Sequence, residues 1–71
     1  MDISFRLYYL RMKHGCTKTA IAKAVGVSRR TVYAWERGLK YPTAKHIVKL
    51  AKFFHVSTDY MMNIENDCTE Q

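Results

Sequence analysis

The stretch GVSRRTVYAWERG, residues 26–38, decides the fold of this chain. Its first three residues predict a tight turn that ends in a helix N-cap, because Gly adopts positive φ at low cost and Ser is a favoured cap. After the cap, Val32 and Trp35 recur at helical spacing. We therefore expect a short helix over residues 29–36, which Gly38 ends.

The residues just before this stretch predict a second short helix, KTAIAKAV, over residues 18–25. Thr17 is a suitable N-cap, and Ile21 and Val25 form the apolar stripe. Ala22 is small at the place where two helices would cross closely. Two short helices joined by a three-residue turn that contains Gly form a helix-turn-helix unit.

Three further helices are predicted by the same periodicity, over residues 2–13, roughly 43–54, and a short segment that Ser57 caps. No segment alternates with period two, so we predict an all-α, compact bundle of five short helices. At 71 residues the chain has room for one small domain, which we place at residues 1–62. The expected buried residues of the first and fourth helices are Ile3, Leu7, Leu10, Ile47, Leu50, Ala51 and Phe54.

Charge is distributed unevenly along the chain. Residues 1–62 hold all twelve Lys and Arg residues and three acidic ones, a net charge of +9. Residues 63–71 hold three acidic residues and no basic one, and we expect this acidic tail to be flexible. A basic body favours a polyanion as partner, nucleic acid ahead of an anionic membrane. A merely solubilising surface remains the alternative as far as charge alone is concerned.

Other chemistries find little support in the sequence. The three His and two Cys residues lack metal-ligand spacing, and no catalytic arrangement fits so small a domain. We therefore expect no metal, no cofactor, no small-molecule ligand and no enzyme activity. Neither a signal peptide nor an apolar run of membrane-spanning length is visible, so the expected location is the cytoplasm, in association with the nucleoid.

The segment TKTAIAKAVGVSRRTVYAWERG, residues 17–38, resembles the helix-turn-helix of the phage repressor and Cro family, also called XRE-like. Residues 6–15, RLYYLRMKHG, and residues 41–62, YPTAKHIVKLAKFFHVSTDYMM, are similar to that family's first helix and to its fourth and fifth helices. The resemblance implies a lambda-repressor-like DNA-binding domain. It also implies that the third helix lies in the DNA major groove with its first turn toward the bases.

By this resemblance, Arg29, Arg30 and Ala34 fall on base-facing positions, with Tyr33 beside them. Arginine can pair in bidentate fashion with guanine, at about 1–3 kcal/mol of discrimination per good pair. The paired arginines would then stand at the exposed tip of the helix because that tip enters the groove. The alternative is that each arginine contacts only phosphate or water, since phosphate contacts outnumber base contacts.

Further roles follow from the same resemblance. Arg11 and Glu36 match a pair that the family uses as a structural salt bridge between the first and third helices. Lys18 stands where the family has Gln, which removes an amide that could brace a base-reading residue. The N-terminus of the second helix and the loop after the third are suited to phosphate. The predicted phosphate-binding residues are Thr17, Lys18, Arg37, Lys40 and Tyr41.

The leading functional hypothesis is a sequence-specific, double-stranded DNA-binding transcriptional regulator, a Cro-like repressor that acts as a homodimer on an inverted-repeat operator. The alternative is an antitoxin-like or adaptor domain of the same fold that binds an acidic protein. RNA is a poorer fit, because its major groove is too narrow for the third helix. The dimer-interface candidates are Phe53, Tyr60, Met62 and Ile64, whereas Met61 is expected in the core.

Overall fold

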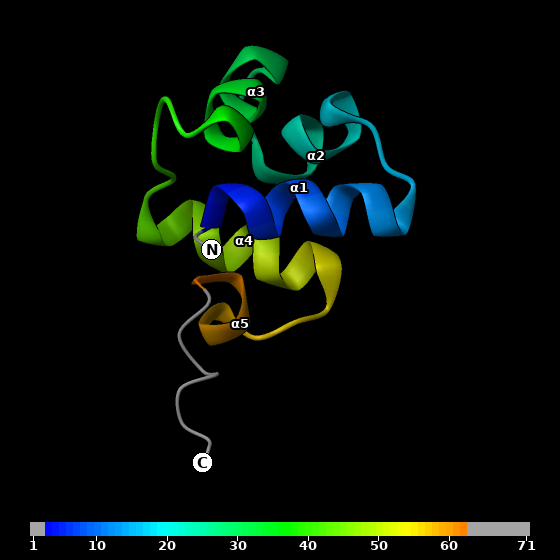
Figure 1. The fold of residues 1–71 in the computed structure, drawn as a ribbon, viewed down its shortest axis with the longest axis vertical. Helices are drawn as coiled ribbons and strands as arrows, with labels where there is room; N and C mark the ends of the chain where they lie inside the picture. Colours follow the sequence, from blue (N-terminus) through cyan, green and yellow to red (C-terminus); the bar gives the residue numbers. More distant parts are fainter. Residues whose placement is uncertain (1–2, 63–71) are drawn as a thin grey trace.

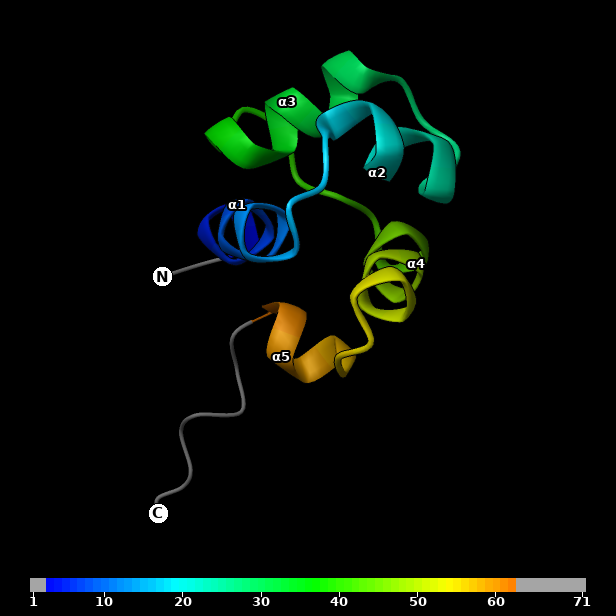
Figure 2. The same ribbon diagram turned by 90° about the vertical axis from the view of Figure 1, so that its right-hand side faces the viewer.

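The computed structural model describes residues 3–62 as five α-helices with no strand among them. Figures 1 and 2 show α2 and α3 together at one end, α1 and α4 in the middle, and α5 at the opposite end. The predicted all-α bundle is confirmed, whereas the predictions for the acidic tail, residues 63–71, lie outside the described residues. The helices are α1 (Ile3–His14), α2 (Lys18–Val25), α3 (Arg29–Arg37), α4 (Ala44–Phe54) and α5 (Thr58–Met62).

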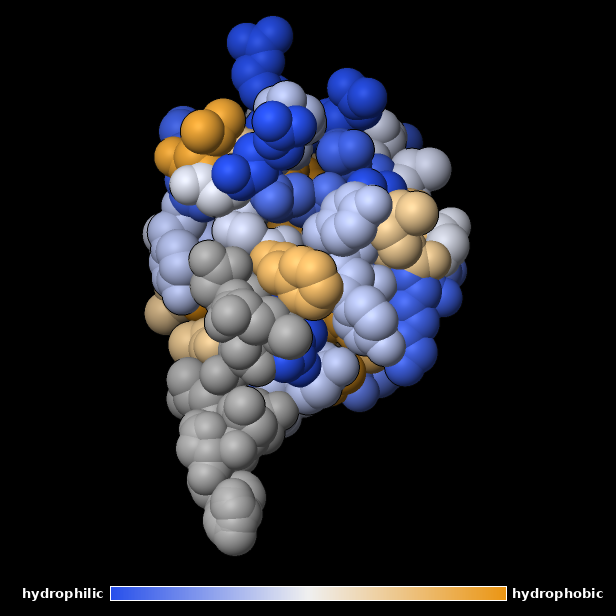
Figure 3. All heavy atoms as spheres, in the orientation of Figure 1, coloured by the Kyte–Doolittle hydropathy of each residue, from blue (hydrophilic) through white to orange (hydrophobic). Residues whose placement is uncertain are grey.

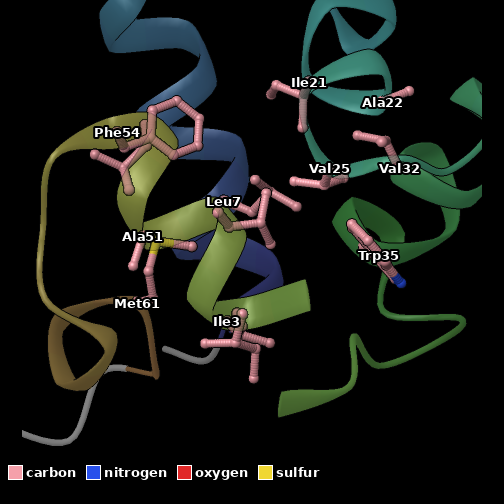
Figure 4. Close-up of a cluster of buried hydrophobic side chains, with 13 residues drawn as sticks. Ile3, Leu7, Ile21, Ala22, Val25, Val32, Trp35, Ala51, Phe54 and Met61 are labelled. Atoms are coloured by element: carbon pink, nitrogen blue, oxygen red, sulfur yellow. The ribbon is translucent and has the colours of Figure 1, made fainter. Parts of the chain in front are cut away.

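One apolar cluster holds the bundle together, and side chains from all five helices converge in it (Figure 4). The apolar stripes predicted for α1, α2, α3 and α4 all lie in this cluster, and Met61 brings α5 into it. Each fully buried Leu, Ile or Phe side chain contributes about 1.5–3 kcal/mol of transfer free energy. The cluster consists of Ile3, Leu7, Leu10, Ile21, Ala22, Val25, Val32, Trp35, Ile47, Leu50, Ala51, Phe54 and Met61.

Side-chain hydroxyls cap the starts of four helices. Thr17 accepts a hydrogen bond from the amide of Ala20 at 3.0 Å, and Ser28 accepts one from Thr31 at 3.1 Å. The predicted caps of α2 and α3 are thereby confirmed, and Ser57 caps α5 in the same way. The fourth helix begins one residue later than expected, because Thr43 is its N-cap. Each such cap is worth about 1 kcal/mol of helix stability.

The C-terminal ends of α1 to α4 are each followed by a residue with positive φ. Glycine occupies three of these positions, as the sequence indicated, but His55 follows α4 with φ of 60°. Its amide donates to the carbonyl of Lys52, and the next amide, of Val56, donates to Ala51. His55 is therefore an αL cap, in which a residue with a Cβ atom is strained.

Replacing His55 with glycine should raise the free energy of unfolding by about 0.5–1 kcal/mol, because glycine adopts the αL conformation without the Cβ clash. Urea unfolding followed by circular dichroism measures the change. His55→Ala is the matched control, since it removes the imidazole but keeps the Cβ atom, and it should not stabilise the domain. Equal stabilisation by both variants would count against backbone strain as the cause.

Within residues 3–62, no helix has the length and apolarity that crossing a lipid bilayer requires. The same part of the chain contains no group of three or more His, Cys, Asp or Glu side chains placed to hold a metal ion.

Candidate nucleic-acid interface

The helix-turn-helix is formed by α2 and α3, which pack directly on each other. Gly26 follows α2 with φ of 81°, and Ser28, the N-cap of α3, has extended backbone. Together, the backbone conformations of Gly26 and Ser28 change the direction of the chain within three residues. Ala22 lies on the side of α2 that faces the core and is 4% exposed, so a larger side chain there would displace its closely packed neighbours.

The inner face of α3 holds the helix on the domain. Val32 and Trp35 are buried in the core, and the Trp35 ring lies 5.2 Å from the ring of His46 on α4. The opposite face carries exposed polar and charged side chains, so the first turn of α3 projects from a rigid base. The exposed residues of this face are Arg29, Arg30, Tyr33 and Arg37.

Positive charge at the α2–α3 end is not neutralised by neighbouring acids. Among residues 3–62 the only acidic residues are Glu36, which is paired with Arg11, and Asp59, which lies on α5 at the other end of the bundle. Figure 3 shows strongly hydrophilic side chains over the end of the molecule that α2 and α3 form. An uncompensated basic surface of this kind attracts polyanions.

The predicted phosphate-binding residues all lie at this end. Four of them are exposed and Lys18 is half-buried. Thr17 uses its hydroxyl oxygen as the N-cap acceptor, which leaves other backbone amides of the first turn of α2 available to an anion. The Arg37 guanidinium lies 5.6 Å from the centre of the Tyr33 ring, a cation–π contact along the outer face of α3.

The predicted salt bridge between Arg11 and Glu36 is confirmed. Arg11 Nε donates to Glu36 Oε2 at 2.6 Å, and Arg11 Nη2 donates to Oε1 at 3.2 Å. The side chains are only 12% and 4% exposed. The hydrogen bond to Glu36 raises the pKa of Arg11, against a smaller lowering by burial. This bidentate pair joins α1 to α3 and thus helps to set the orientation of the basic face.

Ala34 departs from the sequence-based expectation. The family resemblance places Ala34 on a base-facing position of α3, but the residue is only 8% exposed. The chain folds back after Gly38, and the amides of Leu39 and Lys40 donate to the Ala34 carbonyl at 2.9 and 3.4 Å, so this segment packs against Ala34 and reduces its exposure. Leu39 itself is 71% exposed, and its sequence signal is that of an apolar residue inside a basic loop.

The dimer-interface candidates do not share one surface. Phe53, Tyr60 and Met62 are each partly buried against the core, and each lines a different surface depression. Tyr60 lies under the guanidinium of Arg6, 3.9 Å from its ring centre. Met62 lines an apolar groove between α4 and α5 together with Val48. Ile64 lies outside the described residues.

Comparison with known proteins agrees with this geometry. Residues 7–61 match the sequence profile of the helix-turn-helix family. An uncharacterized HTH-type transcriptional regulator of Methanocaldococcus jannaschii is 40% identical over 62 residues, which is 87% of this chain and 94% of that protein. The HTH-type transcriptional activator BcrR of Enterococcus faecalis is 31% identical over 92% of this chain but only 32% of its own length.

A similar solved structure is that of the P22 c2 repressor protein in complex with a synthetic operator. It superimposes with a TM-score of 0.84 at 28% identity and covers 92% of this chain and 98% of its own. The chain is therefore a member of the XRE-type helix-turn-helix family of DNA-binding transcriptional regulators.

Proposed function

We propose that this protein is a sequence-specific regulator that binds double-stranded DNA as a homodimer, with α3 in the major groove. The observation that carries the proposal is the outer face of α3. Arg29 and Arg30 are exposed in its first turn, and no carboxylate among the described residues lies within salt-bridge distance of either. Their donors are available to a ligand, while the buried face of the helix holds them in place.

Recognition would use two kinds of contact, one with base edges and one with phosphates. The guanidinium groups of Arg29 and Arg30 match the O6 and N7 acceptors of guanine, and Tyr33 lies beside them. Lys18 with the free amides of α2, and Arg37, Lys40 and Tyr41 after α3, would contact phosphates, which position the helix without reading sequence. Affinity should therefore depend strongly on salt, and selectivity on α3.

A dimer would place two α3 helices in successive major grooves on one face of the duplex, about 34 Å apart. The apolar groove that Met62 and Val48 line is the best-supported interface, because Val48 is an exposed apolar side chain at its edge. Similarity to the P22 c2 repressor supports repression by occupation of a promoter. Such a protein would act on the nucleoid, in the cytoplasm.

Selection from a random duplex library, at salt near physiological concentration, tests the proposal. Non-specific affinity is then only about 10⁻⁴–10⁻⁶ M, so enrichment reports specific binding. We expect an inverted repeat that contains guanine, with half-site centres about 10 base pairs apart. A folded protein that enriches no sequence would contradict the proposal and favour an adaptor that binds an acidic protein partner.

A further inference from the structure

We propose that the cleft beside α3, under Leu39, is a subsite for the 5-methyl group of a thymine in the DNA major groove. The inference rests on the proposed function and adds a second specificity element to the arginine pair. Leu39 has no part in that pair, and it is not among the described residues that form the core or pack against it.

The cleft lies between the outer face of α3 and the chain that follows it, and it has a volume of about 350 Å³. Two apolar residues line it, Ala34, which is buried, and Leu39, which is exposed. Figure 3 shows a hydrophobic patch within the hydrophilic surface at this end, over the segment that connects α3 to α4 in Figure 1. The lining residues are Arg30, Thr31, Tyr33, Ala34, Leu39 and Lys40.

Backbone hydrogen bonds fix the shape of this cleft. Gly38 adopts φ of 76°, and its amide donates to the Trp35 carbonyl at 3.2 Å. The Leu39 amide donates to the Ala34 carbonyl at 2.9 Å. Together these bonds form a Schellman motif, which holds Leu39 beside Ala34 before any ligand binds. In a preformed site, ligand binding requires little further ordering of the backbone, so its entropic cost is small.

The Schellman motif alone does not explain why the Leu39 side chain is so exposed. An apolar contact between the equivalents of Leu39 and Ala34 commonly accompanies the motif, and it normally hides part of the side chain. Here Leu39 remains 71% exposed. Single exposed apolar residues are common on protein surfaces, but this one lines a cleft that the buried Ala34 also lines.

The flanking charges identify the ligand. Arg30 and Lys40 both line the cleft, so its apolar part lies within the surface that would face DNA. The apolar part of the cleft, at Ala34 and Leu39, offers no hydrogen-bond partner to a phosphate or to the polar edge of a base. The thymine 5-methyl is the apolar group that the major groove presents, and small apolar side chains are its usual contacts. Seating the methyl would cover part of the exposed surface of Leu39.

Replacement of thymine by deoxyuridine removes the methyl group and changes nothing else in the base pair. We would replace each thymine of the selected operator in turn and measure the Kd by fluorescence anisotropy. One thymine in each half-site should be sensitive, with Kd about fourfold weaker for one replacement and about 15-fold weaker for both. These are the fold-changes that correspond to burial of one methylene-sized group at ~0.8 kcal/mol.

Protein variants tie the effect to Leu39. Leu39→Ala should weaken binding to the thymine operator and abolish the difference between thymine and uracil. Leu39→Met, which keeps an apolar side chain of similar volume, should retain the difference. Met12→Ala is the matched control, because Met12 is an exposed apolar residue on α1, and it should leave both Kd values unchanged. Circular dichroism verifies that each variant is folded.

The possible outcomes separate this inference from the proposed function. Selective binding that no thymine-to-uracil replacement weakens would overturn the subsite and leave the regulator intact. A thymine effect that persists in Leu39→Ala would likewise overturn the assignment to this cleft. Failure to bind any sequence selectively would overturn the proposed function, and the subsite with it.

Discussion

Replacing Glu36 with glutamine should lower the free energy of unfolding by about 3–5 kcal/mol, because it leaves the largely buried guanidinium of Arg11 without its counter-charge. The two hydrogen bonds between these side chains connect α1 to α3. Domains of this kind are stable by only about 5–15 kcal/mol, so the variant should be marginally folded. It should also bind DNA less well, since α3 loses one of its attachments.

Urea unfolding, followed by circular dichroism and by the fluorescence of Trp35, the single tryptophan of the chain, measures this loss. Asp59→Asn is the matched control. It removes the same charge from an exposed residue in the first turn of α5, where a helix-dipole interaction is worth only about 0.3–1 kcal/mol. Similar small losses in the two variants would show that the Arg11–Glu36 pair contributes little.

A double replacement separates the charge effect from the packing effect. Arg11→Met combined with Glu36→Leu removes both charges and keeps most of the volume, so it should recover much of the stability that Glu36→Gln loses. The pair should add no pH dependence through Arg11 in the ordinary range. Because folding raises the pKa of Arg11, its contribution is complete below the unfolded-state pKa and is lost only as strongly alkaline pH passes the folded-state value.

The second large effect is expected from Arg30→Ala, which should weaken binding to the selected operator by about 5- to 150-fold. That range corresponds to the 1–3 kcal/mol of one bidentate contact with guanine. Binding to random duplex should change far less, because loss of one charge removes at most one phosphate-type contact. Parallel titrations of operator and random DNA, at one fixed salt concentration, measure both effects.

Two variants complete the test of Arg30. Arg30→Lys keeps the charge but lacks the planar fork, so it should restore non-specific affinity and leave the operator contact weak. Lys49→Ala removes one positive charge from the exposed face of α4 and should preserve discrimination. Equal losses on operator and random DNA in Arg30→Ala would show that Arg30 contacts phosphate rather than a base.

Much of this architecture could be predicted from the sequence, because the signals are local. Spacing of apolar residues located the helices, and Thr17 and Ser28 marked where two of them begin. Such patterns work because helix periodicity and capping depend on residues within one turn of each other. Resemblance to a known family paired Arg11 with Glu36, across 25 residues, which no local signal could have done.

Other features depended on contacts between segments that no periodicity reports. The sequence offers Phe53, Tyr60 and Met62 as dimer-interface candidates, but the packing of the helices places them in three separate depressions. His55 takes a conformation that favours glycine, because two backbone hydrogen bonds at the end of α4 require it there.

The sequence by itself determined which face of each helix is apolar, where the positive charge lies and which arginines begin α3. Only the tertiary structure decided which apolar residues of that charged face are buried and which are exposed. Because the chain folds back after Gly38, Ala34 is buried, whereas Leu39 lies beside it and is exposed. The physical reason is that burial is set by everything that packs around a residue, whereas periodicity describes only the element to which the residue belongs.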